Sequence, residues 1–277
     1  MCAAHQAFRA GCEQPIMGLV VDSREVLSRR AAPPDVVVRY GDRADQICDL
    51  RLPPATGAPL VVLLHGGFWR AAWDRTHLRP MADALVGAGH AVAMPEYART
   101  GDGGGWPATF EDVSRAVAAV PELATEAVRG AVDPAKVVLA GHSAGGQLAL
   151  WCAGRGLPAA HGGVVALAPV ADLAEAFRLD LDGGAVLELM GGGPDQVPDR
   201  YERADPCQLP APSTPVVLVH GRADAYVPVD LSRRYAAHSR AELHLLDGVG
   251  HFDLIDPLSA AWPTVLEAIT DLSGRPG

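Results

Sequence analysis

Basic residues are scarce in this sequence, and long hydrophobic runs are missing. Its 277 residues include 23 Lys and Arg against 33 Asp and Glu, for a formal net charge of −10, and Lys136 is the one lysine. Because affinity for nucleic acid depends mainly on basic side chains that neutralise phosphates, we expect no nucleic-acid partner. No stretch approaches the roughly 20 apolar residues of a membrane helix, so we expect no membrane span either.

Cysteine is sparse too, and its pattern excludes the common cysteine-based sites. The five cysteines, Cys2, Cys12, Cys48, Cys152 and Cys207, are widely spread and form no CxxC pair or Cys/His ligand spacing. We therefore expect reduced thiols in a cytoplasmic protein. The N-terminal stretch lacks the continuous apolar core of a signal peptide. Residues 1–34 show no clean period, so we expect an N-terminal arm that is partly disordered and in which Met17 is an alternative start.

Motifs for metals and cofactors are also missing. The sequence has no H-x-x-x-H, no His/Asp cluster at ligand spacing, no P-loop lysine and no G-x-G-x-x-G after a strand. The glycine-rich stretches "GDGGGW" and "MGGGP" do not join a strand to a helix, so we interpret them as flexible loops that border the site. No cofactor and no metal are implied.

What the sequence does contain is a series of eight short apolar runs from Asp35 onward: "DVVVRY", "ICDLRL", "PLVVLLH", "HAVAMPEY", "KVVLAGH", "GGVVALAP", "PVVLVHG" and "AELHLLDG". The last six are separated by helix-length stretches such as 74–88, 109–128, 144–153 and 229–239, as in parallel βαβ units. The first two follow each other closely, as in an antiparallel start. Continuous Val/Leu runs suit strands that are buried on both faces.

These patterns predict one α/β domain over residues 35–277. Its fold would be a three-layer α/β/α sandwich with a mostly parallel eight-stranded sheet. Residues 172–206 interrupt the alternation, because they contain helical pieces broken by glycines and no strand. We expect this segment to form a small lid over the sheet edge.

A glycine-flanked serine lies between a predicted strand and a predicted helix. Gly141-His142-Ser143-Ala144-Gly145 matches G-x-S-x-G in the strand–turn–helix context that this motif needs. The sharp turn strains the serine backbone, and a side chain at either glycine would collide with neighbouring backbone. Ser143 Oγ would then project above the sheet at a helix N-terminus, whose positive end favours a developing oxyanion. The alternative is a helix N-cap serine after a glycine turn.

A serine nucleophile needs a base, and the base needs an orienting carboxylate. Asp224 follows "PVVLVHG" and His251 follows "AELHLLDG", so both occupy loops at the C-terminal ends of predicted strands. We predict a Ser143–His251–Asp224 triad, in the chain order of α/β-hydrolases. Asp247 and Asp253 are rival carboxylates, but they lie beside the histidine in sequence, where a loop rarely aims both side chains at each other. The alternatives are a turn-capping aspartate and a loop histidine held by backbone.

The stretch "LLHGGFW" also follows a predicted strand directly. Backbone N–H groups in such a glycine turn can stabilise an oxyanion, so we assign the oxyanion hole to the N–H of Ala144 and that of Gly67 or Phe68. We expect His65 to brace this loop by hydrogen bonding. His220, in "LVHG", is expected to be a structural histidine at a strand end.

Aromatic residues are few, with five each of Trp, Tyr and Phe. Four of them, Phe68, Trp69, Tyr97 and Trp106, follow predicted strands or lie in glycine-rich loops. We predict that they line a flat apolar substrate pocket; the alternative is ordinary core packing. The expected partner is a small-molecule substrate, and the protein is expected to be a monomer or a homodimer.

The motifs "HGGFW", "GHSAGG", "DAYVP" and "GHFDLID" resemble those of the α/β-hydrolase superfamily, from about Asp35 to the C-terminus, and in particular its esterase and arylformamidase (kynurenine formamidase-like) branch. The resemblance implies that Ser143 is the nucleophile, that Asp224 and His251 are its partners, and that residues 66–69 form the oxyanion hole. It implies a serine hydrolase that cleaves a small carboxylic ester or an N-formyl aryl amide through an acyl-enzyme.

Other members of the superfamily share parts of this pattern. "HGGFW" and "GHSAGG" also resemble esterases that act on acetylated or feruloylated sugars. "D-x-x-VP" resembles oligopeptidase-like amide hydrolases, whose large N-terminal propeller 277 residues cannot hold. A non-catalytic binding protein with a hydrolase fold is a further alternative, although such a protein would normally lack one member of the triad. An epoxide hydrolase would usually have Asp where Ser143 stands.

Overall fold

A single eight-stranded sheet forms the centre of the computed structural model, which describes residues 23–157 and 162–274. The strands are β1 (Val36–Arg39), β2 (Ile47–Arg51), β3 (Ala58–Leu64), β4 (Ala91–Pro95), β5 (Val132–His142), β6 (Gly163–Leu167), β7 (Val216–Gly221) and β8 (Glu242–Leu246). Their spatial order is β1-β2-β4-β3-β5-β6-β7-β8. Pairing is antiparallel from β1 to β2 and from β2 to β4, and parallel across the rest of the sheet. All eight predicted strands and the antiparallel start are thus confirmed.

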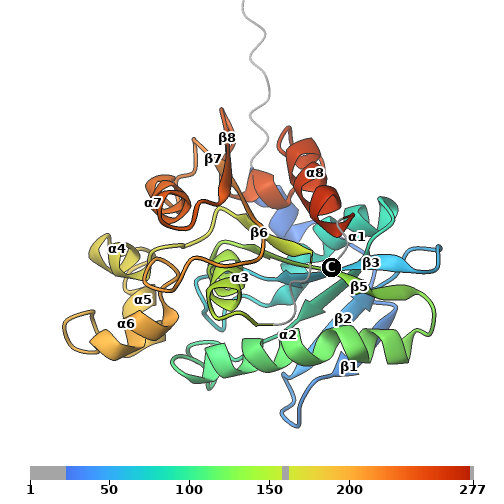
Figure 1. Cartoon of the computed structure of the whole chain (residues 1–277), viewed down its shortest axis with the longest axis horizontal. Coiled ribbons are helices and arrows are strands. Elements are labelled where there is room, and N and C mark those ends of the chain that lie inside the picture. Colours follow the sequence, from blue (N-terminus) through green and yellow to red (C-terminus); the bar gives the residue numbers. More distant parts are fainter. Residues whose placement is uncertain (1–22, 158–161, 275–277) are drawn as a thin grey trace, which may run out of the picture.

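Helices cover both faces of the sheet (Figure 1). One face packs against α2 (Ala108–Ala127) and α3 (Ala144–Gly154), and the other against α1 (Arg79–Gly87) and α8 (Trp262–Ser273). The remaining helical elements are η1 (Ser23–Ser28), η2 (Arg75–Leu78), α4 (Leu173–Arg178), α5 (Ala185–Met190), α6 (Pro198–Ala204), α7 (Asp230–Ser239) and η3 (Phe252–Ile255). The predicted three-layer sandwich is therefore confirmed.

The central strands are apolar without alternation because each of their faces is buried under a different helix layer. In β3, Leu60, Val62 and Leu64 join the cluster beneath α2 and α3, whereas Val61 and Leu63 join the cluster beneath α1 and α8. Strands buried on both faces read as continuous hydrophobic runs. The sequence pattern thus reflects two cores on opposite sides of one sheet.

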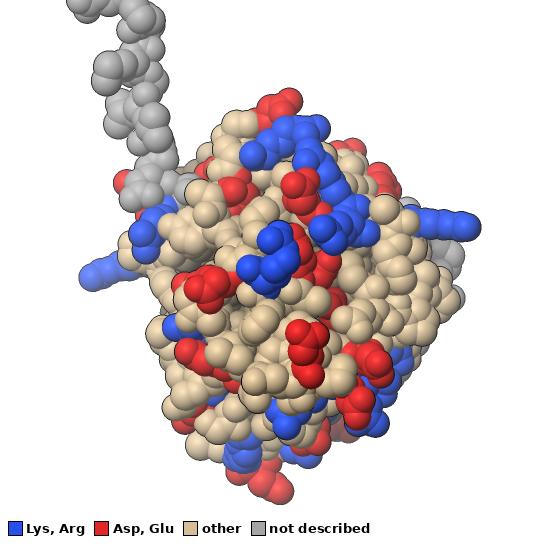
Figure 2. Space-filling view, turned by 90° about the vertical axis from the view of Figure 1, so that its left-hand side faces the viewer, with Lys and Arg blue, Asp and Glu red and all other residues tan. Residues whose placement is uncertain are grey.

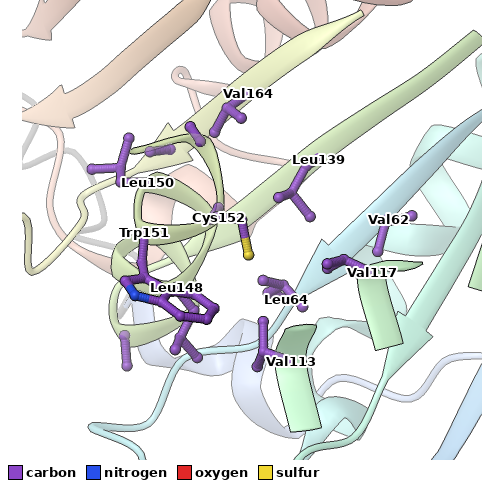
Figure 3. Close-up of a cluster of buried hydrophobic side chains, with 14 of the residues drawn as sticks. Val62, Leu64, Val113, Val117, Leu139, Leu148, Leu150, Trp151, Cys152 and Val164 are labelled. Atoms are coloured by element: carbon purple, nitrogen blue, oxygen red, sulfur yellow. The ribbon is translucent and has the colours of Figure 1, made fainter. Parts of the chain in front are cut away.

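Helix α3 is buried along almost its whole length, and this burial fixes the position of the residue that precedes it. Figure 3 shows Leu148 and Cys152 of α3 among side chains of α2 and of the neighbouring strands, such as Val113 and Leu139. Truncation of a buried leucine of this kind to alanine costs roughly 2–5 kcal/mol. The start of α3 is therefore held rigidly against the sheet.

Three cysteines fall within the described residues. Cys48, Cys152 and Cys207 are free thiols, as expected, and burial raises the pKa of each of them. Cys2, Cys12 and Met17 lie outside the described residues. The cysteines that are described thus have the character of inert packing residues.

The segment 172–206 forms α4, α5 and α6, which lie beside the C-terminal ends of the parallel strands (Figure 1). Arg70, which follows β3, donates to the carbonyl oxygens of Asp182 (2.8 Å) and Gly183 (3.2 Å) in the loop before α5. It also pairs with the carboxylates of Asp182 and Glu188, each at 3.3 Å. This segment is therefore attached directly to the loop that carries "HGGFW".

Candidate active site

Ser143 occupies a sharp turn between β5 and α3. Its backbone lies in the left-handed region, with φ 57° and ψ −118°, and the residue is 2% exposed. A Cβ on Gly141 would lie 2.2 Å from Gly145 O, and one on Gly145 would lie 2.2 Å from Leu64 O. Both glycines are therefore required by close backbone contacts, as predicted. The Ser143 side chain makes no capping hydrogen bond to α3, which contradicts the N-cap alternative.

The loops after β7 and β8 bring Asp224 and His251 together. His251 Nδ1–H donates to Asp224 Oδ2 at 2.7 Å, and Asp224 Oδ1 accepts from the backbone N–H groups of Tyr226 and Val227, each at 2.8 Å. With the proton on Nδ1, the neutral imidazole keeps a lone pair on Nε2. This arrangement suits His251 to accept a proton from a neighbouring group.

The two rival carboxylates have other partners. Asp247 pairs with Arg222 at 2.9 Å, and its side chain is 91% exposed. Asp253 accepts from the backbone N–H of Gly250 at 2.6 Å. Asp224 is the carboxylate that the fold presents to His251.

His220 lies on the far side of the same carboxylate. Its Nε2–H donates to Val227 O at 3.0 Å and lies 3.3 Å from Asp224 Oδ2, while its Nδ1 accepts from Ser232 Oγ at 2.7 Å. Burial acts to raise the pKa of Asp224, but hydrogen bonds from His220 and His251 outweigh it and hold that pKa well below its usual range. His220 is fully buried at a strand end, as expected, and it also helps to orient Asp224.

His142, the residue before Ser143, holds the backbone of the histidine loop. Its Nε2–H donates to His251 O at 3.0 Å, and the two rings lie 4.5 Å apart. Burial lowers the pKa of His142 well below its usual value, and the neighbouring His251 lowers it further. His142 is therefore a neutral hydrogen-bond donor that links the serine turn to the histidine loop.

The "HGGFW" loop follows β3 and lies against the serine turn. A Cβ on Gly66 would lie 3.1 Å from Ser143 Cβ, and the backbone of Gly67, Phe68 and Trp69 is left-handed, with φ 106°, 48° and 58°. Among the hydrogen bonds of residues 23–157 and 162–274, none uses the backbone N–H of Gly67, Phe68 or Ala144. These are the N–H groups that the sequence assigns to an oxyanion hole.

His65 braces this loop through a buried network. Its Nε2 lies 2.7 Å from Glu96 Oε1, its ring stacks on Tyr97 at 4.2 Å, and the Tyr97 hydroxyl donates to His65 O at 2.8 Å. Burial acts to raise the pKa of Glu96, but the interactions with His65 and Arg99 outweigh it and lower that pKa to about 2. The prediction that His65 supports the loop is confirmed.

A cavity of about 160 Å³ opens beside Ser143 and His251. Its wall is formed by Arg24, Leu27, Gly67, Phe68, Trp73, His77, His142, Ser143, Asp182, Tyr226, His251 and Phe252. Four of these side chains are aromatic rings of Phe, Trp or Tyr. The wall therefore combines an apolar surface with Ser143, His251 and two residues of the "HGGFW" loop, Gly67 and Phe68.

Of the four aromatic residues predicted to line the substrate pocket, Phe68 lies on the wall of this cavity, whereas Trp69, Tyr97 and Trp106 do not. Trp69 is fully buried and donates from Nε1 to Gln147 Oε1 at 3.1 Å, and Tyr97, 1% exposed, packs on His65. Trp106 lines a separate surface cavity of about 380 Å³ that does not include Ser143. Core packing, the stated alternative, therefore describes Trp69 and Tyr97.

Three further aromatic residues on the cavity wall, Trp73, Tyr226 and Phe252, were not assigned to it by sequence reasoning. Trp73 follows "HGGFW" by four residues. A Cβ on Gly67 would lie 2.3 Å from Trp73 Cβ, so Trp73 packs on the "HGGFW" loop. Tyr226 follows Asp224 by two residues, and Phe252 follows His251 directly. The sequence signal that could have identified these residues is their closeness to the motif residues along the chain.

The two glycine-rich stretches also differ from the expectation of flexible loops at the site. In "GDGGGW", a Cβ on Gly104 would lie 2.4 Å from the Arg99 backbone, and Gly105 N–H donates to Thr109 Oγ1 at 2.9 Å. In "MGGGP", Gly192 O accepts from the Tyr201 hydroxyl at 3.1 Å. Neither stretch contributes to the wall of the Ser143 cavity.

The surface charge, the possible metal ligands and the helices of the described residues also bear on which partners the protein could bind. Figure 2 shows both basic and acidic side chains on the side of the molecule that carries α4, α5 and α6. Within the described ranges, no group of three or more His, Cys, Asp or Glu residues could hold a metal ion. In that same part of the chain, no helix has the length and apolar character to cross a membrane.

Comparisons with known proteins agree with this architecture. The model of the prolyl oligopeptidase family matches residues 106–250, and a family model named BD-FAE matches residues 48–157. Among curated proteins, none matches this sequence.

Solved structures of esterases share the fold. Esterase B from Lactobacillus rhamnosis is 19% identical with a TM-score of 0.73, and the alignment covers 91% of this chain and 90% of that one. A truncated carbohydrate esterase from gut microbiota is 19% identical with a TM-score of 0.71, covering 88% and 100%. A thermophilic esterase from Thermogutta terrifontis is 23% identical with a TM-score of 0.65, covering 85% and 92%. The sheet and its helices thus form an α/β-hydrolase fold.

Proposed function

Because the chain belongs to the prolyl oligopeptidase family, we propose that it is a serine hydrolase in which Ser143, His251 and Asp224 form the catalytic triad. One observation carries this proposal: the strained Ser143 and a histidine already oriented by a buried carboxylate line the same cavity. A structural serine would not need the close glycine contacts around it. The geometry therefore fits nucleophilic catalysis.

The proposed mechanism is acyl transfer in two steps. His251 Nε2 takes the proton as Ser143 Oγ attacks the substrate carbonyl carbon, and the tetrahedral oxyanion is stabilised by the N–H groups of Ala144 and of Gly67 or Phe68. The leaving group takes the proton from His251 and departs. Water then attacks the acyl-enzyme with His251 as base, which releases the acid and restores Ser143. Asp224 keeps the proton on Nδ1 and stabilises the imidazolium.

The cavity favours a small carboxylic ester as substrate. Its volume of about 160 Å³ is below the 300–1,000 Å³ typical of pockets for drug-sized ligands. Phe68, Trp73 and Phe252 give it an apolar wall, so a short acyl or a compact aryl group would fill it. The esterase structures that share the fold support this choice.

A second candidate is an N-formyl aryl amide. A formyl group is the smallest acyl group, and the aromatic wall formed by Trp73, Tyr226 and Phe252 offers surfaces on which an aryl leaving group could stack. An oligopeptidase-like amide hydrolase would have to place a peptide in the same small cavity. A non-catalytic binding protein with this fold would normally lack one of the three triad residues, whereas Ser143, His251 and Asp224 are all present.

The test compares release rates from p-nitrophenyl acetate, p-nitrophenyl octanoate and N-formylkynurenine, with Ser143→Ala as the blank. We expect the acetate ester to be cleaved fastest and Ser143→Ala to be inactive. A clear preference for the formyl amide would support the second candidate. Activity of Ser143→Ala close to that of the wild type would refute the proposed triad.

A further inference from the structure

The N-terminal segment contributes to the wall of the Ser143 cavity. Arg24 and Leu27, both from η1, line this cavity together with Phe252 and Trp73. Both family models match the chain only from residue 48 onward. One side of the candidate active site is therefore built by residues outside the matched regions.

Two contacts hold η1 against the domain. Val26 is 1% exposed and belongs to the cluster beneath α1 and α8, and Leu27 packs against the same cluster. After η1, Arg29 forms a two-pronged ion pair with Asp256, whose side chain is 6% exposed; the second of its hydrogen bonds measures 2.9 Å. The guanidinium of Arg29 lowers the pKa of Asp256. The segment is thus fixed in place next to η3, which follows His251.

The position of Leu27 gives it an effect on substrate size. It is partly buried and apolar, and it borders a cavity of only about 160 Å³. In a closed apolar pocket, one methylene group changes binding or discrimination by about 10-fold to 200-fold. Removal of three side-chain carbons at this wall would therefore admit a longer substrate group.

We propose that η1 is a specificity-determining part of the site, in which Leu27 limits the length of the substrate group that fills the cavity. This inference rests on the proposed serine hydrolase function. It goes beyond that function because it assigns substrate selection to a segment that neither the catalytic motifs nor the family models include. Leu27 itself is a positioning and selecting residue, without a role in the chemical step.

The experiment measures kcat/KM for p-nitrophenyl acetate, butyrate and octanoate, and for the acetates of ethanol, butanol and octanol. In one of the two series, the variable group of the substrate occupies this cavity. In that series, Leu27→Ala should raise the ratio of kcat/KM for the eight-carbon substrate to kcat/KM for the two-carbon substrate about tenfold. Leu27→Trp should lower the same ratio. Arg29→Gln, which breaks the ion pair with Asp256, should shift the ratio in the direction of Leu27→Ala.

Leu258→Ala serves as the matched control, because Leu258 is 79% exposed and does not line the cavity. Its ratios should equal those of the wild type. Unchanged ratios in both series for Leu27→Ala and Leu27→Trp, with wild-type activity intact, would overturn the inference and leave the proposed function standing. A wild-type protein that cleaves neither these esters nor N-formylkynurenine, with Ser143→Ala equally inactive, would overturn the proposed function and the inference with it.

Discussion

The two sides of the Ser143 cavity are built in different ways. The side that carries the proposed triad consists of three segments, each of which follows a parallel strand of the sheet, and these segments bring Ser143, Asp224 and His251 to one edge. The opposite wall consists of η1, the loop that ends in η2, and residue Asp182 before α5. The position of the first side follows from the order of the strands in the sheet. The second side depends on how segments that are distant in sequence pack against the domain.

This difference separates the residues proposed to catalyse the reaction from those that determine which substrate fits. The residues of the proposed triad lie at the ends of strands of one packed sheet, and these strands fix the direction in which each following segment begins. Wall residues such as Leu27 and Trp73 come from short connecting segments, where changes affect the shape of the cavity without moving the sheet. Substitutions on the catalytic side should therefore change kcat, and substitutions on the wall should change substrate preference.

The largest effect is expected at Asp224. Asp224→Asn keeps the shape of the side chain but offers an N–H or a neutral oxygen to His251 Nδ1, which disturbs the histidine tautomer and removes the charge that stabilises the imidazolium. In a triad, this change lowers kcat by on the order of 10⁴-fold. Ester hydrolysis by Asp224→Asn and Asp247→Asn should be measured together. Because Asp247 is exposed, its variant should retain wild-type kcat, and equal losses in both would contradict the assignment of Asp224.

The next largest loss of kcat is expected in the "HGGFW" loop. A Cβ at Gly67 would meet Trp73 Cβ at 2.3 Å, and the residue has φ 106°, so Gly67→Ala must shift the loop. Loss of one oxyanion donor costs about 10²–10³-fold in kcat, and we expect the lower end of that range. Gly57→Ala is the control, because Gly57 also has a positive φ, 66°, but nothing lies within 4 Å of its added Cβ. If both variants lost kcat equally, backbone strain in general would explain the result.

Stability should fall on mild acidification because of the wall residue His77. Burial, with a further contribution from His65, lowers the pKa of His77 from its usual 6.5 to about 4. Between these values the unfolded chain binds a proton that the folded protein does not, so the stabilisation is complete above pH 6.5 and is lost as the pH falls towards 4. For this group the free energy of unfolding should be about 2 kcal/mol lower at pH 5 than at pH 7.

Urea denaturation at both pH values checks this prediction. His77→Leu should show a pH dependence smaller by about 2 kcal/mol than that of the wild type. Part of the dependence should remain, since the pKa of His142 is also lowered by burial. An identical pH dependence in wild type and variant would show that His77 does not titrate in this way.

The smallest effect separates two tryptophans only four residues apart in sequence. Trp69→Phe removes the hydrogen bond to Gln147 in the core, which should cost about 1 kcal/mol of stability and leave KM unchanged. Trp73→Phe alters the cavity wall, so it should change KM while stability stays close to that of the wild type. Thermal unfolding and KM for p-nitrophenyl acetate distinguish the two. A raised KM in Trp69→Phe alone would place the substrate next to Trp69.

The centre of the sheet could be predicted from the sequence because strands such as β4, β6 and β7 are buried on both faces. Their apolar runs are continuous, and the intervening segments have helix length, so parallel βαβ units were predicted. The G-x-S-x-G motif also predicted the close glycine contacts at Gly141 and Gly145. The motif was sufficient at these two positions because the need for glycine comes from backbone atoms in the turn and in the adjacent strand.

The cavity wall could not be predicted in the same way. The left-handed backbone of Phe68 and Trp69 redirects the side chains after "HGG", so strand alternation no longer indicates which aromatic ring faces the cavity. Residues 1–34 were expected to form an arm, yet Val26 and Leu27 pack on the domain beside η3. Such docking depends on contacts between residues more than 200 positions apart, such as Arg29 with Asp256, and no periodic pattern encodes it.

The most direct test of the triad is covalent labelling of the nucleophile. Wild-type protein and Ser143→Ala are incubated with diisopropyl fluorophosphate, and the modified peptide is identified by mass spectrometry. We predict one phosphoryl adduct on Ser143, loss of ester hydrolysis in proportion to labelling, and no adduct in Ser143→Ala. Labelling of a different residue, or hydrolysis that persists in the fully labelled protein, would contradict the proposal that Ser143 attacks the substrate.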